Sequence, residues 1–98
     1  MSTPAATPLD IHHEPDAHRF AARIAGTDAV LEYETLDAKT LEYHHTFVPQ
    51  ALRGGGIASQ LTAFALRYAR ENGLKVRPTC PFVARYLTRH PEFQPLVG

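Results

Sequence analysis

Residues 48–58, with the sequence VPQALRGGGIA, join a strand-like segment to an amphipathic helix through three consecutive glycines. Glycine has no Cβ atom, so the backbone can curl until successive N–H groups point into one concavity. The first turn of the following helix adds unpaired N–H donors and the positive end of the helix dipole. This junction is therefore typical of a site that holds phosphate groups through the backbone.

Two common phosphate-binding motifs do not fit this loop. A Walker A loop needs a Lys-Ser or Lys-Thr pair after its glycines, whereas these glycines are followed by Ile57, Ala58 and Ser59. A Rossmann fingerprint needs a third spaced glycine, which is missing here. The remaining pattern, Arg53-x-x-Gly56-x-Ala58, resembles the Q/R-x-x-G-x-G/A loop with which the GNAT acetyltransferase superfamily grips the pyrophosphate of acetyl-CoA.

The resemblance extends beyond the loop to residues 43–49 (YHHTFVP), 78–83 (PTCPFV) and 90–93 (HPEF). Together these segments are similar to the short, single-domain branch of GNAT-like N-acetyltransferases, closely over roughly the last 60 residues and by pattern alone before them. The resemblance implies acetyl-CoA as co-substrate, an amine as acceptor, and a CoA site formed by the strand end, the loop and the helix start. The residues that it assigns to this site are Val48, Arg53, Gly54, Gly55, Gly56, Ile57, Ala58 and Ser59.

Alternating apolar residues predict an antiparallel meander of three strands, at 18–24, 29–35 and 41–48. Residues 25–28 (AGTD) are typical of a hairpin turn between the first two strands. The third strand is expected to present four side chains on one face: Leu41, Tyr43, His45 and Phe47.

After the loop the period of the apolar residues becomes helical. We expect one helix from Ile57 to a stop at Gly73, then a short strand at 74–77 parallel to the third strand, because a helix separates them. Pro81 fits the first position of a second helix that runs to about His90, before Pro91. The prediction is a mixed α/β, GNAT-like fold.

The composition favours one small domain. We expect residues 1–10 to be a flexible tail and 11–98 to be a single domain, because a chain of 98 residues supports one modest core. His12, His13 and His18 lack the spacing of a zinc site and are interpreted as solvated. The sequence has no secretory or membrane-spanning pattern, so we expect a cytoplasmic protein. A single cysteine cannot form an internal disulfide, and we expect no bound metal.

The net charge is zero but unevenly distributed. Residues 1–50 carry three basic and eight acidic side chains, and residues 51–98 carry seven basic and two acidic ones. An anionic acyl-CoA would be attracted to the second half and a cationic amine to the first, although differently solvated surfaces would give the same asymmetry. Neither nucleic acid nor a membrane is expected as a partner. The chain is expected to be a monomer or a weak homodimer.

Cys80 is the candidate nucleophile. It lies at the end of the fourth predicted strand, just before Pro81 opens a helix, and a helix N-terminus favours a thiolate electrostatically. The family resemblance implies that the acyl thioester lies beside it, where the third and fourth predicted strands splay apart. A small buried side chain at the helix start is the structural alternative.

His45 is the candidate base. An imidazole can take up a proton near neutral pH, and an ammonium acceptor must lose one before it attacks a thioester. The alternative is a hydrogen-bonded core histidine. Glu42 is a second candidate for proton uptake, and Tyr86 is a weak candidate for protonating the departing CoA thiolate.

These observations predict an acetyl-CoA-dependent N-acetyltransferase acting on an amine, either directly or through acetylated Cys80. A non-catalytic acyl-CoA-binding or regulatory module would need the loop but neither Cys80 nor His45. A small interaction protein would use the glycines only as a tight turn.

Overall fold

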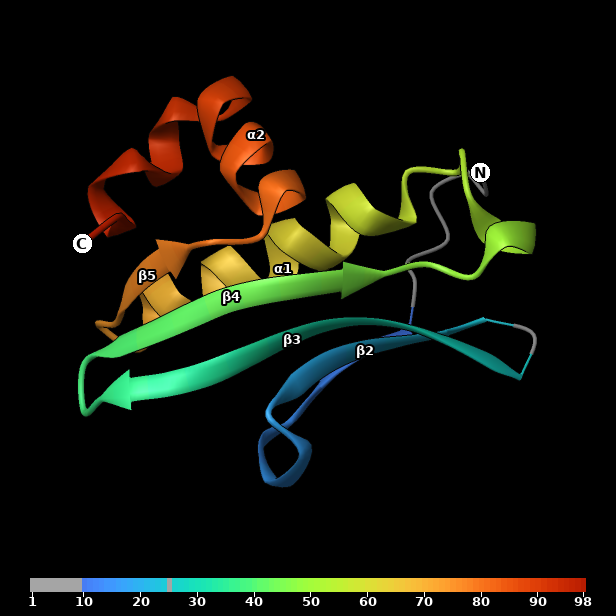
Figure 1. Ribbon diagram of the computed structural model, residues 1–98, viewed down its shortest axis with the longest axis horizontal. Helices are drawn as coiled ribbons and strands as arrows, with labels where there is room; N and C mark the ends of the chain where they lie inside the picture. The colour runs from blue at the N-terminus through green and yellow to red at the C-terminus, as the bar shows by residue number, and fades with distance from the viewer. Residues whose placement is uncertain (1–9, 25) are drawn as a thin grey trace, which may run out of the picture.

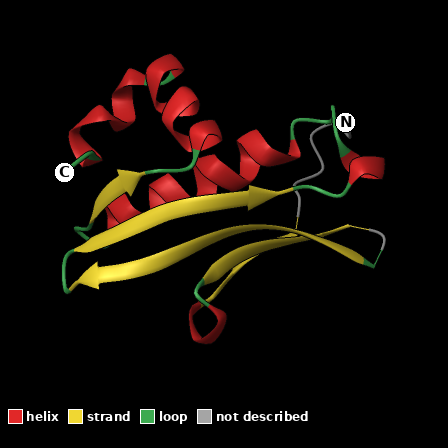
Figure 2. Ribbon diagram, in the orientation of Figure 1, coloured by secondary structure: helices red, strands yellow, loops and turns green. Residues whose placement is uncertain are grey.

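The computed structural model describes residues 10–24 and 26–98. Its strands are β1 (Asp10–Glu14), β2 (Arg19–Ile24), β3 (Thr27–Asp37), β4 (Thr40–Phe47) and β5 (Lys75–Pro78). Its helices are α1 (Ile57–Glu71) and α2 (Pro81–Arg89), with short 3-10 helices η2 (Pro15–Ala17), η3 (Gln50–Leu52) and η4 (Pro91–Leu96). The strands β1 to β4 form an antiparallel meander and β5 pairs parallel to β4 (Figure 1; Figure 2). The predicted mixed α/β fold is confirmed.

The core lies between one face of the sheet and the two helices. Phe20, Leu31 and Tyr43 project into it from β2, β3 and β4, and all three are buried. Fully burying a side chain of this kind stabilises the fold by roughly 1.5–3 kcal/mol. The helices complete the core with buried residues of α1 (Ile57, Leu61, Ala65, Leu66, Ala69) and α2 (Val83, Leu87).

The first strand was not predicted. Residues 10–14 pair antiparallel with β2, so the expected tail boundary at residue 10 falls inside a strand; residues 1–9 lie outside the described chain. The interpretation of His13 as solvated is wrong. Its ring stacks on Phe20 at 4.5 Å between centroids, and its Nε2 lies 2.6 Å from the Tyr33 hydroxyl oxygen. Burial lowers the pKa of His13.

A β-bulge changes the direction of the side chains in β4. Tyr33 pairs with Tyr43 and Glu32 pairs with His45, so His44 is an extra residue in β4. Beyond the bulge Thr46 pairs with the buried Leu31, and His45 is exposed. The expectation that His45 and Phe47 share the face of Leu41 and Tyr43 is therefore wrong, because one inserted residue exchanges the two faces of a strand.

The helices begin and end where the sequence signals indicate. Helix α1 starts after Gly56 and ends before Gly73, whose φ of +68° is favoured by glycine at a helix end. Helix α2 opens at Pro81 and ends at Arg89, and η4 follows from Pro91. In Figure 1, α1 runs along the far side of β4. This arrangement brings the start of α1 and the start of α2 to one side of the sheet.

Candidate functional site

The glycine loop has a backbone shape that other residues would adopt only under strain. Gly54 has a φ of +90° and Gly56, the N-cap of α1, a φ of +79°. Both values lie in the left-handed region, which glycine enters without a steric penalty. Because Gly56 has no side chain to cap the helix, the first-turn amides of α1 remain available to a ligand.

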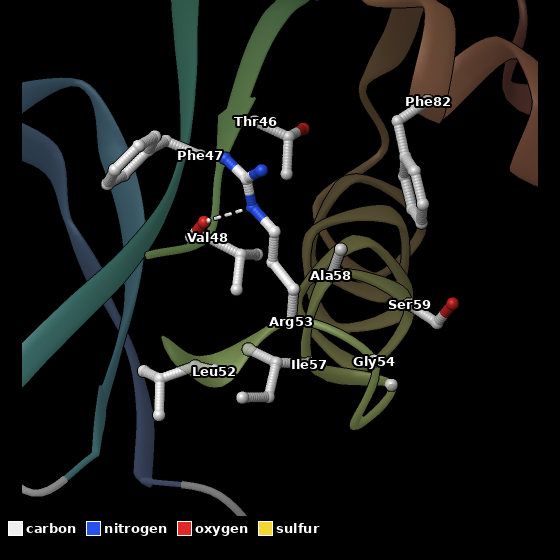
Figure 3. A pocket seen from close by; sticks show the side chains of 11 residues that line it. Thr46, Phe47, Val48, Leu52, Arg53, Gly54, Ile57, Ala58, Ser59 and Phe82 are labelled. Carbon is white, nitrogen blue, oxygen red and sulfur yellow. Dashed lines mark hydrogen bonds between the residues drawn. The ribbon is translucent and has the colours of Figure 1, made fainter. Parts of the chain in front are cut away.

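The loop borders a cavity of about 480 Å³ between β4, α1 and α2 (Figure 3). Seven of the eight predicted CoA-binding residues line it; Gly55 is in the loop but outside the lining. The structure adds four lining residues that sequence reasoning missed: Thr46, Phe47, Leu52 and Phe82. The sequence could have indicated Phe82 as a lining residue, because it lies in the first turn of a predicted helix. It could not have indicated Thr46, because the direction of that side chain depends on the bulge.

Arg53 is the charged side chain of this cavity. Its Nε donates a hydrogen bond of 3.0 Å to the carbonyl oxygen of Val48, and Figure 3 shows the guanidinium extending from the loop toward Val48 and Thr46, with Phe82 on the opposite wall. The guanidinium is exposed. Its remaining N–H donors are of the type that pairs with phosphate oxygens.

Cys80 lies where β4 and β5 part. The last paired residues of these two strands are Tyr43 and Pro78. The Cys80 N–H donates a hydrogen bond of 3.0 Å to the Tyr43 carbonyl oxygen. Cys80 is the N-cap of α2 and its residue is 5% exposed. The sulfur lies 3.5 Å from the hydroxyl oxygen of Thr46, one of the residues that line the cavity.

The side chain of His45 points away from Thr46 and Cys80. It stands opposite Glu32 on the exposed side of the sheet, whereas Thr46 and Cys80 lie on the side of the helices. The structure thus separates the two predicted catalytic residues onto opposite faces of β4.

The two weaker candidates also have defined surroundings. Glu42 accepts a 2.8 Å hydrogen bond from the hydroxyl of Thr79, the residue before Cys80. Tyr86 stacks on His90 at 3.9 Å between ring centroids, and burial together with Glu92 raises its pKa. These contacts give Tyr86 a packing role on α2.

Within 10–24 and 26–98, no three His, Cys, Asp or Glu side chains come close enough together to bind a metal ion. Over the same part of the chain, no helix has the length and apolarity needed to cross a membrane.

A family model described as GCN5-related N-acetyl-transferase matches residues 19–96, which includes the glycine loop, the bulged strand and Cys80. The chain belongs to the GCN5-related N-acetyltransferase family. This assignment agrees with the parting strands and the glycine N-cap described above, and it covers both halves of the candidate site.

Individual relatives in this family are similar over most of the chain. Protein NATD1 of Xenopus tropicalis is 35% identical over 85 residues, which is 85% of this chain and 78% of that protein. Protein NATD1 of Homo sapiens is 35% identical over 86 residues, 86% of this chain and 76% of that protein. The solution structure of a GCN5-like putative N-acetyltransferase from Staphylococcus aureus matches with a TM-score of 0.72 over 94% of this chain and 90% of that chain. Its 24% identity makes it evidence for the GCN5-related fold alone.

Proposed function

We propose that the chain is an acetyl-CoA-dependent acetyltransferase that passes an acetyl group through Cys80 to an amine. The observation that carries this proposal is one continuous path: the cavity runs from the glycine loop to Thr46, whose hydroxyl oxygen is 3.5 Å from the Cys80 sulfur. A pocket for a phosphorylated carrier in which one lining residue contacts a thiol suits acyl transfer better than binding alone. Membership of the family supports the same reaction class.

The residues of the cavity fit acetyl-CoA. Backbone amides of the loop and of the first turn of α1 would bind the pyrophosphate, and Arg53 would add charge-assisted hydrogen bonds. Phe82, Val48 and Leu52 provide apolar wall for the pantetheine arm. The backbone edge of β4 beyond residue 43, released from β5, supplies N–H groups for the thioester carbonyl.

The chemistry has two balanced steps. In the first, the Cys80 sulfur attacks the thioester carbonyl; the bond from carbon to Cys80 forms, the bond to the CoA sulfur breaks, and the thiol proton ends on CoA. In the second, the amine nitrogen bonds to the acetyl carbon, the bond to Cys80 breaks, and the thiolate takes up a proton.

His45 would act in the second step. For an acceptor that enters over the edge of β4 beyond residue 43, where β5 no longer pairs, the imidazole of His45 beside Glu32 would remove the proton that the ammonium must lose. In a direct transfer to the amine, His45 would have the same function. The acidic first half of the chain favours a cationic acceptor.

The test is a calorimetric titration with acetyl-CoA followed by intact-mass measurement. We expect binding, one added acetyl group, loss of that group in neutral hydroxylamine, and no adduct in Cys80→Ala. Binding without an adduct, but with turnover of lysine methyl ester or spermidine, would replace the covalent route by direct transfer. Binding with neither would identify a non-catalytic acyl-CoA module, and absence of binding would overturn the function altogether.

A separate variant tests the base. His45→Gln should form the Cys80 adduct at the normal rate and transfer it to the amine about 100-fold more slowly. His44→Gln, one residue away at the bulge, is the matched control and should retain transfer. Equal transfer by both variants would remove His45 from the mechanism.

A further inference from the structure

We propose that Thr46 is a positioning residue for the Cys80 thiol, an inference that rests on the proposed function of this site. Thr46 lines the cavity, and its hydroxyl oxygen lies 3.5 Å from the Cys80 sulfur. A sulfur–oxygen separation of this size is within hydrogen-bonding reach.

The bulge at His44 explains why a threonine occupies this place. Without the extra residue, the alternation of β4 would direct His45 toward the helices and Thr46 toward solvent. With it, Thr46 aligns with the buried Leu31 and faces the start of α2. The bulge therefore exchanges a bulky imidazole beside the thiol for a small hydroxyl.

Two contacts from the same strand hold Cys80, one on each side of the bulge. The Tyr43 carbonyl oxygen accepts the Cys80 N–H at 3.0 Å and so fixes the backbone, while Thr46 contacts the sulfur. The Thr46 side chain is branched at Cβ, which restricts rotation about χ1 and keeps the hydroxyl in a narrow set of directions. The sulfur is thereby held against β4, in contact with a residue that lines the cavity.

This arrangement has a defined consequence for the first chemical step. When the Cys80 thiol loses its proton, the Thr46 hydroxyl can donate a charge-assisted hydrogen bond to the sulfur anion. The carbon–sulfur bond to Cys80 then forms, the carbon–sulfur bond to CoA breaks, and CoA leaves with the proton. Thr46 itself exchanges no bond with the acetyl group.

The experiment compares Thr46→Val, which keeps the branched shape without the hydroxyl, with Thr46→Ser, which keeps the hydroxyl. Thr88→Val, on the exposed side of α2, is the control for a threonine-to-valine change. Three quantities are measured in the full chain: acetyl-CoA affinity by calorimetry, the rate of acetyl adduct formation by intact mass, and the rate of Cys80 alkylation by iodoacetamide without acetyl-CoA. We expect Thr46→Val to bind acetyl-CoA normally and to slow both thiol reactions about tenfold or more, and Thr46→Ser to restore both.

The outcomes separate this inference from the proposed function. Unchanged adduct and alkylation rates in Thr46→Val would overturn the role of Thr46 and leave the acetyltransferase proposal intact. Equal slowing in the valine and serine variants, with lowered thermal stability, would show a packing role and also overturn it. If wild-type protein forms no adduct, the covalent route fails, while the alkylation rates still decide whether Thr46 controls the thiol.

Discussion

The Cys80 N–H donates a 3.0 Å hydrogen bond to the carbonyl oxygen of Tyr43, immediately before the bulge in β4. This bond lies beyond the last register pair of β4 and β5, so it marks the place where the strands separate. The Tyr43 hydroxyl donates a second bond, of 2.6 Å, to the carbonyl oxygen of Ala65 in α1. One residue thus ties the candidate nucleophile, the bulged strand and the helix that follows the glycine loop.

Tyr43→Phe should destabilise the fold by about 1 kcal/mol, because it removes a buried hydrogen bond while keeping the ring. Burial also raises the pKa of Tyr43, since the interior disfavours the phenolate. The unfolded chain releases the phenolic proton above about pH 10 and the folded chain retains it, so stability is complete below that pH and falls as the pH rises above it. Urea unfolding between pH 8 and 11 should show a shallower alkaline decline in Tyr43→Phe, and Tyr86→Phe, at a less buried tyrosine, should flatten the decline less. If wild type and Tyr43→Phe lose stability in parallel as the pH rises, the Tyr43 hydroxyl does not contribute to the alkaline decline.

Gly56→Ala should lower the stability by about 1 kcal/mol, because a Cβ atom is disfavoured at a φ of +79°. The open space around this position means that the strain comes from the backbone and not from a clash. Gly55→Ala is the matched control, since its φ lies outside the left-handed region and its new Cβ would meet the Leu52 carbonyl oxygen at an ordinary 3.8 Å. Thermal unfolding measures the difference, and equal melting temperatures would show that the loop tolerates a side chain at Gly56.

His13 should make the fold sensitive to mild acid. Burial lowers its pKa from the ordinary 6.5, so the unfolded chain binds the proton more tightly. The contribution of His13 to stability is therefore present above pH 6.5 and is lost as the pH falls through the lowered pKa. His13→Phe keeps a ring against Phe20 and should weaken the loss of stability between about pH 7 and 5. The exposed His12, changed to Gln, is the control, and an unaltered pH dependence in His13→Phe would exclude this role.

Local sequence determined the elements whose signals lie within a few residues. The alternation in β2 and β3, the glycine loop, the apolar stripe of α1 with its stop at Gly73, and Pro81 at the start of α2 all specify their structures locally. The loop spacing and the motifs around Cys80 also indicated the family that the family model confirms. These features are readable because periodicity and φ preferences act over one or two turns of chain.

Tertiary structure alone decided β1, the direction of His45 and the contact between Thr46 and Cys80. The segment DIHHE has no clear strand pattern; it pairs with β2 because His13 stacks on Phe20 and Glu14 accepts a bond from Arg19. The bulge depends on how β3 and β4 align, and it moves every later side chain of β4 to the other face. Thr46 and Cys80 are 34 positions apart and meet only because β4 and α2 pack on one side of the sheet. Such register and long-range packing arise from the whole core, so a local reading of residues 41–48 directs the wrong side chain toward the thiol.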